Sequence, residues 1–228
     1  MLYWLKEMRN FAVILLCSLA TVAVGQDTIP LSNDYPFRDG IYLSFEEFKG
    51  DNPTYTRDQF KIDEIDSTDY DLTKVRKLKV LTDKGKWKSI SINKIWGLAY
   101  DGIPYIYYKG LGSVNNPLSN YDRLTRIDVI GALSMFRLEH VSKNFNTNTF
   151  TNNMVHHDHV FILDMLMDLN SGKIHVFDYY SVEHYIKSDP ELLYELQIHL
   201  REINLYDIVF AYNLRHPIFP SPVSYSTD

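Results

Sequence analysis

Residues 95–108 are Ile95-Trp96-Gly97-Leu98-Ala99-Tyr100-Asp101-Gly102-Ile103-Pro104-Tyr105-Ile106-Tyr107-Tyr108. Two apolar runs flank Asp101-Gly102, a dipeptide that fits the two-residue type I′ turn of an antiparallel hairpin. Such a turn fixes the register: Tyr100 pairs with Ile103, Leu98 with Tyr105 and Trp96 with Tyr107, so that large rings line one face. Pro104 cannot donate to a ladder, which predicts an edge or a loop beside this part of the second strand.

Hairpin signals recur on both sides of this stretch. One hairpin is expected from Val75–Leu81 and Trp87–Ile92, and another from Val160–Leu169 and Lys173–Tyr179 around Asn170-Ser171-Gly172. Between them, the apolar spacing of Leu124–Leu138 fits two consecutive strands, one bent strand or a helix over Asp128–Glu139. The body of the protein is therefore expected to be a set of antiparallel hairpins.

Shorter elements are expected before these hairpins. Gly40–Ser44 is predicted to begin the first ordered element, Phe45–Phe48 to form one helical turn, and Phe60–Ile65 to contain a strand.

The chain becomes helical near its end. Ser181 can cap a short helix, and Asp189-Pro190-Glu191 begins another, with a capping acid followed by a proline in the first turn. A last helix is expected over Tyr206–Leu214, before Pro217. The fold class predicted is α+β, a predominantly antiparallel β meander of hairpins with a C-terminal helical pair packed on one side or end.

The N-terminus has the pattern of a secretory signal peptide. Lys6 and Arg9 precede an apolar run over Phe11–Val24, and small residues end it at Gly25, after which we expect cleavage. The run is too short to span a bilayer comfortably. A lipoprotein anchored through Cys17 is the less favoured alternative, because Leu16 stands where a small residue is required. The protein is thus expected to be exported, either to the periplasm or to the cell surface and medium.

These signals divide the chain into a signal peptide over 1–25, a polar surface leader over 26–39 and a single α+β domain over 40–228. Within that domain, the Asn- and Thr-rich segment 144–153 is expected to be a spacer loop, and 181–216 the helical part. Cys17 is the only cysteine, so the mature chain forms no disulfide. A net charge of −6 without an evident basic stripe argues against nucleic acid as a partner.

The sharpest chemical candidate is the run His156-His157-Asp158-His159, because imidazole and carboxylate are zinc ligands. In a strand His157 and His159 share one face and Asp158 points to the other, so a further ligand must come from elsewhere. His175 would pair near Met167, roughly 26 Å from His159 at ~3.3 Å per residue. We therefore expect a solvated strand entry and no cofactor, with zinc as the alternative.

Aromatic rings give a second candidate site. Trp96, Tyr105 and Tyr107 could stack on sugar rings if exposed, although rings on a hairpin are more often packed in a core. The sequence contains neither an HExxH pattern nor a G-x-S-x-G nucleophile elbow.

Three stretches carry a resemblance to a known group: Asp39-Gly40-Ile41-Tyr42-Leu43-Ser44-Phe45-Glu46-Glu47-Phe48, the hairpin from Trp96-Gly97 to Asp101-Gly102, and the tail from Asp189-Pro190-Glu191-Leu192 through Tyr212-Asn213 to His216-Pro217. Together they resemble uncharacterised exported proteins of Bacteroidota over most of the mature chain. The resemblance implies export, and it implies no reaction and no catalytic residues.

The function expected is that of a non-enzymatic, envelope-associated binding or assembly domain with a protein or glycan partner. The alternatives are a metal-dependent hydrolase using His157 and His159, with Asp158 or Asp164 as its acid, and a glycan-binding module. These differ in what they require. The assembly hypothesis predicts an exposed apolar patch or a strand edge that can pair with a partner.

Overall fold

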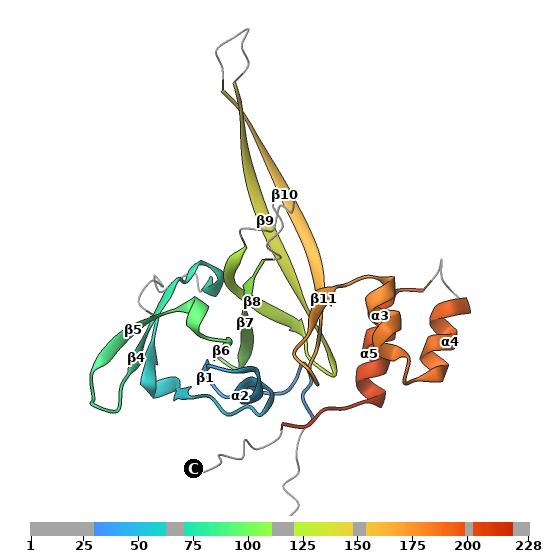
Figure 1. The fold of residues 1–228 in the computed structure, drawn as a ribbon, viewed down its shortest axis with the longest axis horizontal. Helices are drawn as coiled ribbons and strands as arrows, with labels where there is room; N and C mark the ends of the chain where they lie inside the picture. Colours follow the sequence, from blue (N-terminus) through green and yellow to red (C-terminus); the bar gives the residue numbers. More distant parts are fainter. Residues whose placement is uncertain (1–29, 63–70, 111–120, 148–153, 199–202, 221–228) are drawn as a thin grey trace, which may run out of the picture.

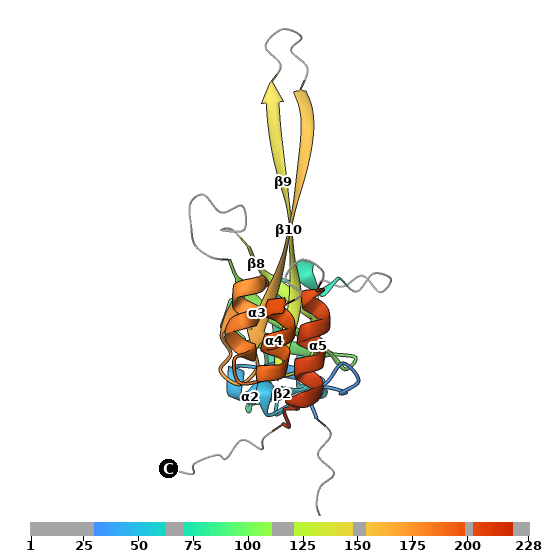
Figure 2. The same cartoon turned by 90° about the vertical axis from the view of Figure 1, so that its right-hand side faces the viewer.

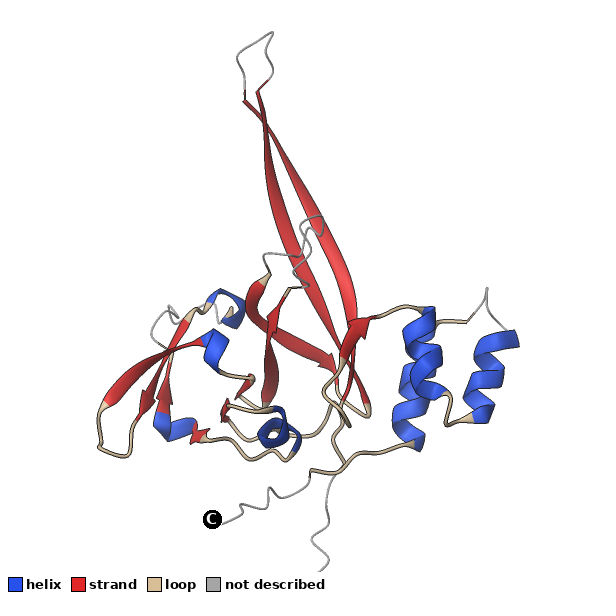
Figure 3. Ribbon diagram, viewed as in Figure 1, coloured by secondary structure: helices blue, strands red, loops and turns tan. Residues whose placement is uncertain are grey.

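A computed structural model describes residues 30–62, 71–110, 121–147, 154–198 and 203–220. The expected α+β class is confirmed: an eight-stranded antiparallel sheet and a three-stranded sheet form the body, and the C-terminal helices lie at one end of it (Figures 1 and 3). None of the helices in these ranges is long and apolar enough to cross a membrane.

The large sheet has the strand order β11-β10-β9-β8-β7-β6-β1-β2, and its neighbouring strands are antiparallel. Its strands are β1 (Gly40–Tyr42), β2 (Tyr55–Thr56), β6 (Gly97–Tyr100), β7 (Ile103–Lys109), β8 (Asp122–Val129), β9 (Leu133–Thr147), β10 (Met154–Asp168) and β11 (Ile174–Val176). From β6 to β11 each strand pairs with the next in sequence, as expected for a meander of hairpins.

The small sheet has the order β3-β4-β5, with β3 at Phe60–Lys61, β4 at Lys77–Leu81 and β5 at Trp87–Ser91. Short 3₁₀ turns flank it at Arg57–Gln59, Leu72–Lys74 and Ile92–Lys94. The β4–β5 hairpin is the one predicted from the sequence. Of the expected strand over 60–65, β3 forms the start, and residues 63–65 lie outside the described ranges.

The hairpin around Asp101-Gly102 has the predicted register. Tyr100 pairs with Ile103 and Leu98 with Tyr105. The φ angles are +52° at Asp101 and +73° at Gly102, the two positive values that a type I′ turn needs. Pro104 pairs with Ala99 on β6, while pairing with β8 begins only at Tyr105, so the side of Pro104 away from β6 has no ladder partner.

Residues 124–138 form two strands, and the alternative of a helix over 128–139 is wrong. Buried and exposed side chains alternate along the end of β8, with Ile127 and Val129 buried and Asp128 exposed, which is the period of a strand. Gly131 lies in the turn to β9, where an added Cβ would stand 2.4 Å from the Asn213 side chain. Asn213 itself bonds the backbone N–H and C=O of Leu133 at 2.8 and 2.9 Å.

The predicted spacer loop over 144–153 is wrong at its start. β9 continues to Thr147, and Asn144 pairs with His157 on β10. Continuous pairing between the two strands outweighs the weak strand preference of asparagine. Residues 148–153 lie outside the described ranges.

The expected surface leader is partly buried. Leu31 and Phe37 are each 3% exposed, and the Leu31 N–H donates to the Ile218 carbonyl at 2.7 Å. Phe37 stacks on Phe48 of α2 (Phe45–Lys49), with ring centroids 5.0 Å apart. Residues 31–37 are thus anchored in the core beside the large sheet, a contact between distant segments that composition does not reveal.

Three helices follow the last strand: α3 (Tyr179–Ile186), α4 (Pro190–Ile198) and α5 (Leu205–Arg215). The predicted pair corresponds to α4 and α5. Asp178, rather than Ser181, is the N-cap of α3, and Ser181 completes a capping box with it. Apolar side chains of all three helices pack on the sheet in one cluster: Val129, Leu133, Met135, Leu166, Val182, Ile186, Leu192, Leu196, Ile208 and Val209.

Candidate functional site

The most prominent surface feature is a two-stranded arm that consists of Leu138–Thr147 of β9 and Met154–Leu163 of β10. Figures 1 and 2 show it rising from the body, away from the helices and from the small sheet. β9 pairs with β8 only at Met135 and Phe136, and β10 pairs with β11 only at residues 165–167. At ~3.3 Å per residue the arm is roughly 30 Å long. No other strand of the described residues pairs with it.

The outer edge of β10 has backbone groups that face away from β9. The Asp164 carbonyl accepts a 2.8 Å hydrogen bond from the N–H of Phe177, the residue that follows β11. Alternate residues of an antiparallel strand direct both backbone groups to the same side. Ile162 and Val160 therefore direct theirs to the same side as Asp164, beyond the point where β11 pairing ends. Among the described residues, no strand pairs with this part of the edge.

Apolar side chains lie on both faces of this open edge. The exposed fractions are 59% for Val160, 38% for Phe161 and 57% for Ile162. Successive residues point to opposite faces, so Val160 and Ile162 share one face and Phe161 lies on the other. Leu163, the next residue, is already packed against the core. The base of the arm thus combines a free strand edge with exposed apolar side chains.

A polar cluster fixes the arm to the body just below this edge. Arg137 Nε on β9 donates to Asp164 Oδ1 at 2.7 Å, and the Tyr206 hydroxyl on α5 donates to Asp164 Oδ2, also at 2.7 Å. The hydrogen bond from Arg137 holds the pKa of the Asp164 carboxyl below its usual range, against the opposing effect of partial burial. The carboxylate therefore joins both arm strands to the helical layer.

The candidate zinc residues His157, Asp158 and His159 lie within the arm. Their segment is a strand, as the zinc argument assumed, and they pair with Asn144, Lys143 and Ser142 of β9. None of these three β9 residues is a usual zinc ligand. His175 pairs with Leu166, far along β10. Among the described side chains, no group of three His, Cys, Asp or Glu residues is arranged to hold a metal ion. Asp164, the alternative acid, is engaged by Arg137.

The three candidate sugar-stacking rings do not form one platform. Trp96 lies before β6 at a bend and packs on Phe48, with centroids 4.6 Å apart, in the cluster that contains α2. Tyr105 and Tyr107 pack instead against the cluster beneath the small sheet. Burial and a hydrogen bond with Asp122 raise the pKa of Tyr107 to about 12. The expected backbone pairing remains, since the Tyr107 N–H donates to the Trp96 carbonyl at 2.9 Å.

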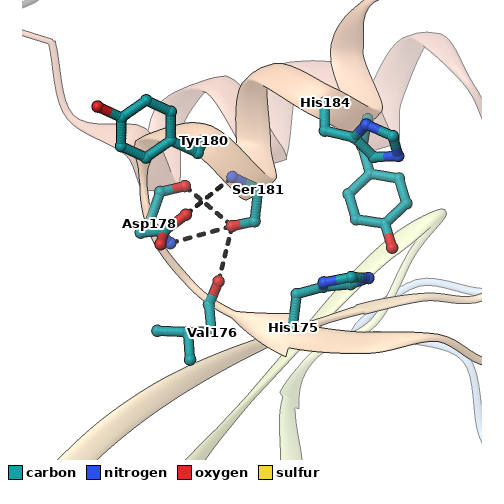
Figure 4. A pocket seen from close by; sticks show the side chains of 7 residues that line it. His175, Val176, Asp178, Tyr180, Ser181 and His184 are labelled. Atoms are coloured by element: carbon teal, nitrogen blue, oxygen red, sulfur yellow. Dashed lines mark hydrogen bonds between the residues drawn. The ribbon is translucent and has the colours of Figure 1, made fainter.

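A shallow hollow of about 330 Å³ lies between β11 and α3 (Figure 4). The polar groups of Ser181 and Asp178 are used by the helix cap: Ser181 Oγ donates to the Val176 carbonyl at 2.7 Å, and the Ser181 N–H donates to Asp178 Oδ1 at 2.8 Å. His175 and His184 both contact the ring of Tyr185 edge-on. Since Ser181 is bonded as a cap and has no histidine partner, the arrangement does not resemble an activated nucleophile.

Sequence reasoning did not identify the edge at Val160, Phe161 and Ile162. The sequence does contain a signal at this point, because three apolar residues directly follow the polar His159. Such a run is also typical of a buried strand, so it does not indicate an exposed edge. Comparisons with protein-family models, with curated proteins and with solved structures find no match to this chain.

Proposed function

We propose that the protein is an exported assembly domain of the cell envelope that associates with a second copy of itself through the outer edge of β10. The observation that carries this proposal is the unpaired backbone edge at Ile162 and Val160. The apolar side chains of these two residues are more than half exposed.

The arm consists of two strands, and its outer edge on β10 has no partner strand among the described residues. A two-stranded ribbon is marginally stable alone in water, and an unpaired strand edge is a template for another strand. Two β10 edges can pair antiparallel about a twofold axis, which makes the same surface serve both copies. Such pairing would cover Val160, Phe161 and Ile162 of each copy and extend the two sheets into one.

Two further observations support export and assembly over hydrolysis. The basic start, apolar run and small residues of the first 25 residues are the pattern of a cleaved export signal. Asp164, one of the two acids considered for a histidine-based hydrolase, is bound by Arg137 and Tyr206. A carboxylate held in this way stabilises the fold and is poorly suited to accept and release a proton.

The test is the molar mass of the purified protein in solution, measured by light scattering over a range of concentrations. Ile162→Pro removes only an N–H that faces the open edge, a position where a strand tolerates proline. We expect a dimer for the native chain and a monomer for Ile162→Pro, with Ile162→Val, which keeps the N–H, still dimeric. Circular dichroism and thermal unfolding check that each variant is folded.

If Ile162→Pro does not fold, lysines at Val160 and Ile162 test the same edge, because charged side chains block strand addition. A native chain that stays monomeric at every concentration would overturn the proposal. A folded edge variant that dimerises as well as the native chain would overturn it too.

A further inference from the structure

The outer face of the small sheet is strongly basic. Along β4, Leu78 and Val80 are buried while Lys77 and Lys79 point to solvent. The register places Lys61 of β3 beside Lys79 on this same outer face. The sheet therefore has one face in the core and one lysine-rich face in water, at the end of the molecule opposite the helices (Figure 1).

This charge is concentrated in one segment of an otherwise acidic chain. Residues 74–94 contain eight basic residues and one acid, Asp83, for a net charge of +7, whereas the whole chain has −6. All eight are exposed: Lys74, Arg76, Lys77, Lys79, Lys84, Lys86, Lys88 and Lys94. The expectation that the chain lacks a basic stripe is thus wrong, because the acidic remainder masks it in the net charge.

A tryptophan stands in the middle of these charges. Trp87, the first residue of β5, pairs with Leu81 and is 40% exposed. The ammonium of Lys61 lies 4.2 Å from the centroid of its ring, a cation–π contact that keeps the indole at the basic surface. An indole flanked by lysines is the combination found at membrane–water interfaces.

The shape of this face selects among anionic partners. It is one side of a three-stranded sheet, and three hollows of the described surface, which lie elsewhere, contain none of its lysines. Lysine is a point charge on a flexible stem, without the planar fork with which arginine grips single phosphates. Single-stranded nucleic acid would need several free rings for stacking, and Trp87 is the one exposed aromatic among the described residues of these strands. A plane of negative charge fits this face best.

We propose that the outer face of the β3–β4–β5 sheet binds the surface of membranes that contain anionic lipids, with Trp87 at the headgroup level. Each lysine near such a surface strengthens binding about fivefold, so the cluster as a whole supports firm and salt-sensitive attachment. This attachment does not depend on the β9–β10 arm, and it would hold the protein at the envelope as a monomer or as a dimer.

The test is co-sedimentation of the purified protein with phosphatidylcholine vesicles, with and without roughly one third phosphatidylglycerol. We expect binding only to the anionic vesicles, and release at high salt. Changing Lys77 and Lys79 to glutamate should weaken binding at least tenfold. The matched control changes Lys173 and Lys187, exposed lysines outside the sheet, to glutamate and should bind nearly as well as the native chain.

Tryptophan fluorescence gives a second readout on the same samples. In protein that begins at Gln26 and so lacks Trp4, the native chain should show a blue shift on anionic vesicles, and Trp87→Phe should lose it while Trp96 remains as the background. Equal binding to neutral vesicles would overturn the proposal, as would equal losses in the two lysine pairs. Binding to single-stranded oligonucleotides without binding to anionic vesicles would also overturn it and would identify a nucleic-acid surface instead.

Discussion

The hydroxyl of Tyr206 on α5 donates a 2.7 Å hydrogen bond to Asp164 on β10, at the point where the arm leaves the body. Arg137 on β9 binds the other oxygen of the same carboxylate at 2.7 Å. One side chain thus connects the helical layer with both strands of the arm. Leu138 and Leu163, one position further out, still contact the core, whereas Ile162 and Val160 are exposed, so this cluster lies close to the point where contact of the arm with the body ends.

Loss of the hydrogen bond from Tyr206 of α5 to this cluster should lower the stability of the protein measurably. Tyr206→Phe deletes the hydroxyl and should lower the free energy of unfolding by about 1 kcal/mol. Asp164→Asn weakens the bonds to Tyr206 and Arg137 together. Because both changes affect one bond, the double variant should lose less than the sum of the single losses in denaturant unfolding. Additive losses would show that Tyr206 and Asp164 are not coupled.

The same carboxylate predicts a dependence of stability on pH. The bond from Arg137 lowers the native pKa of Asp164, so the ionised form is favoured in the folded protein. Its contribution is fully present above the ordinary pKa of aspartate, about 4, and is lost as the pH falls through the lower native pKa. The difference in melting temperature between native protein and Asp164→Asn should shrink as the pH falls from neutral to below 3. A constant difference would contradict this assignment.

A second buried carboxylate fixes the start of the fold. Asp51 is 2% exposed and accepts hydrogen bonds from the hydroxyls of Tyr42 at 2.7 Å and Tyr35 at 2.8 Å, and from the Arg38 N–H at 2.9 Å. Burial, reinforced by the bond to Asp51, raises the pKa of Tyr42 well above its usual range, so this hydroxyl stays a donor. The φ of Asp51 is +46°, a value that Asp and Asn tolerate better than alanine.

Asp51→Ala should therefore destabilise the protein strongly, by roughly 3 kcal/mol or more, because it leaves buried donors without an acceptor and strains the backbone. Asp51→Asn keeps an oxygen acceptor and the backbone preference, so it should cost clearly less. Chemical denaturation of the two variants measures both values. Equal losses would mean that neither the acceptor nor the backbone angle matters.

The sequence predicted the local elements well because their signals are local. Asp101-Gly102 has the positive φ values of a type I′ turn, and the register of Leu98 with Tyr105 follows from it. The start of α4 at Pro190 follows from the capping pattern around Asp189, whose carboxylate accepts from the Leu192 N–H at 3.2 Å. In each case the information lies within a few residues.

The arm and the basic face were missed for two different reasons. Strand β9 extends into the Asn- and Thr-rich segment because β10 pairs with it, and this tertiary effect is not visible in local preferences. The free edge at Ile162 exists only because pairing with β11 stops at Met165. The lysine stripe over Lys77 and Lys79, by contrast, was visible in the sequence and was hidden by summing charge over the whole chain.

The proposed export predicts the mass of the mature protein. Cleavage after Gly25 should give a chain that begins at Gln26, as measured by mass spectrometry of protein recovered from outside the cytoplasm. A lipid-modified chain that begins at Cys17 would support the lipoprotein alternative, and an intact N-terminus at Met1 would contradict cleavage altogether.

Hydrogen exchange at the backbone amides of Val160 and Ile162 tests the central proposal, pairing of β10 edges between two copies, most directly. These two amides face the open edge, so only an added strand can give them hydrogen-bond partners. If two β10 edges pair, we expect slow exchange at high protein concentration and fast exchange on dilution, while the amides of Phe161 and Leu163, which face β9, change little. Fast exchange of Val160 and Ile162 at every concentration would contradict it.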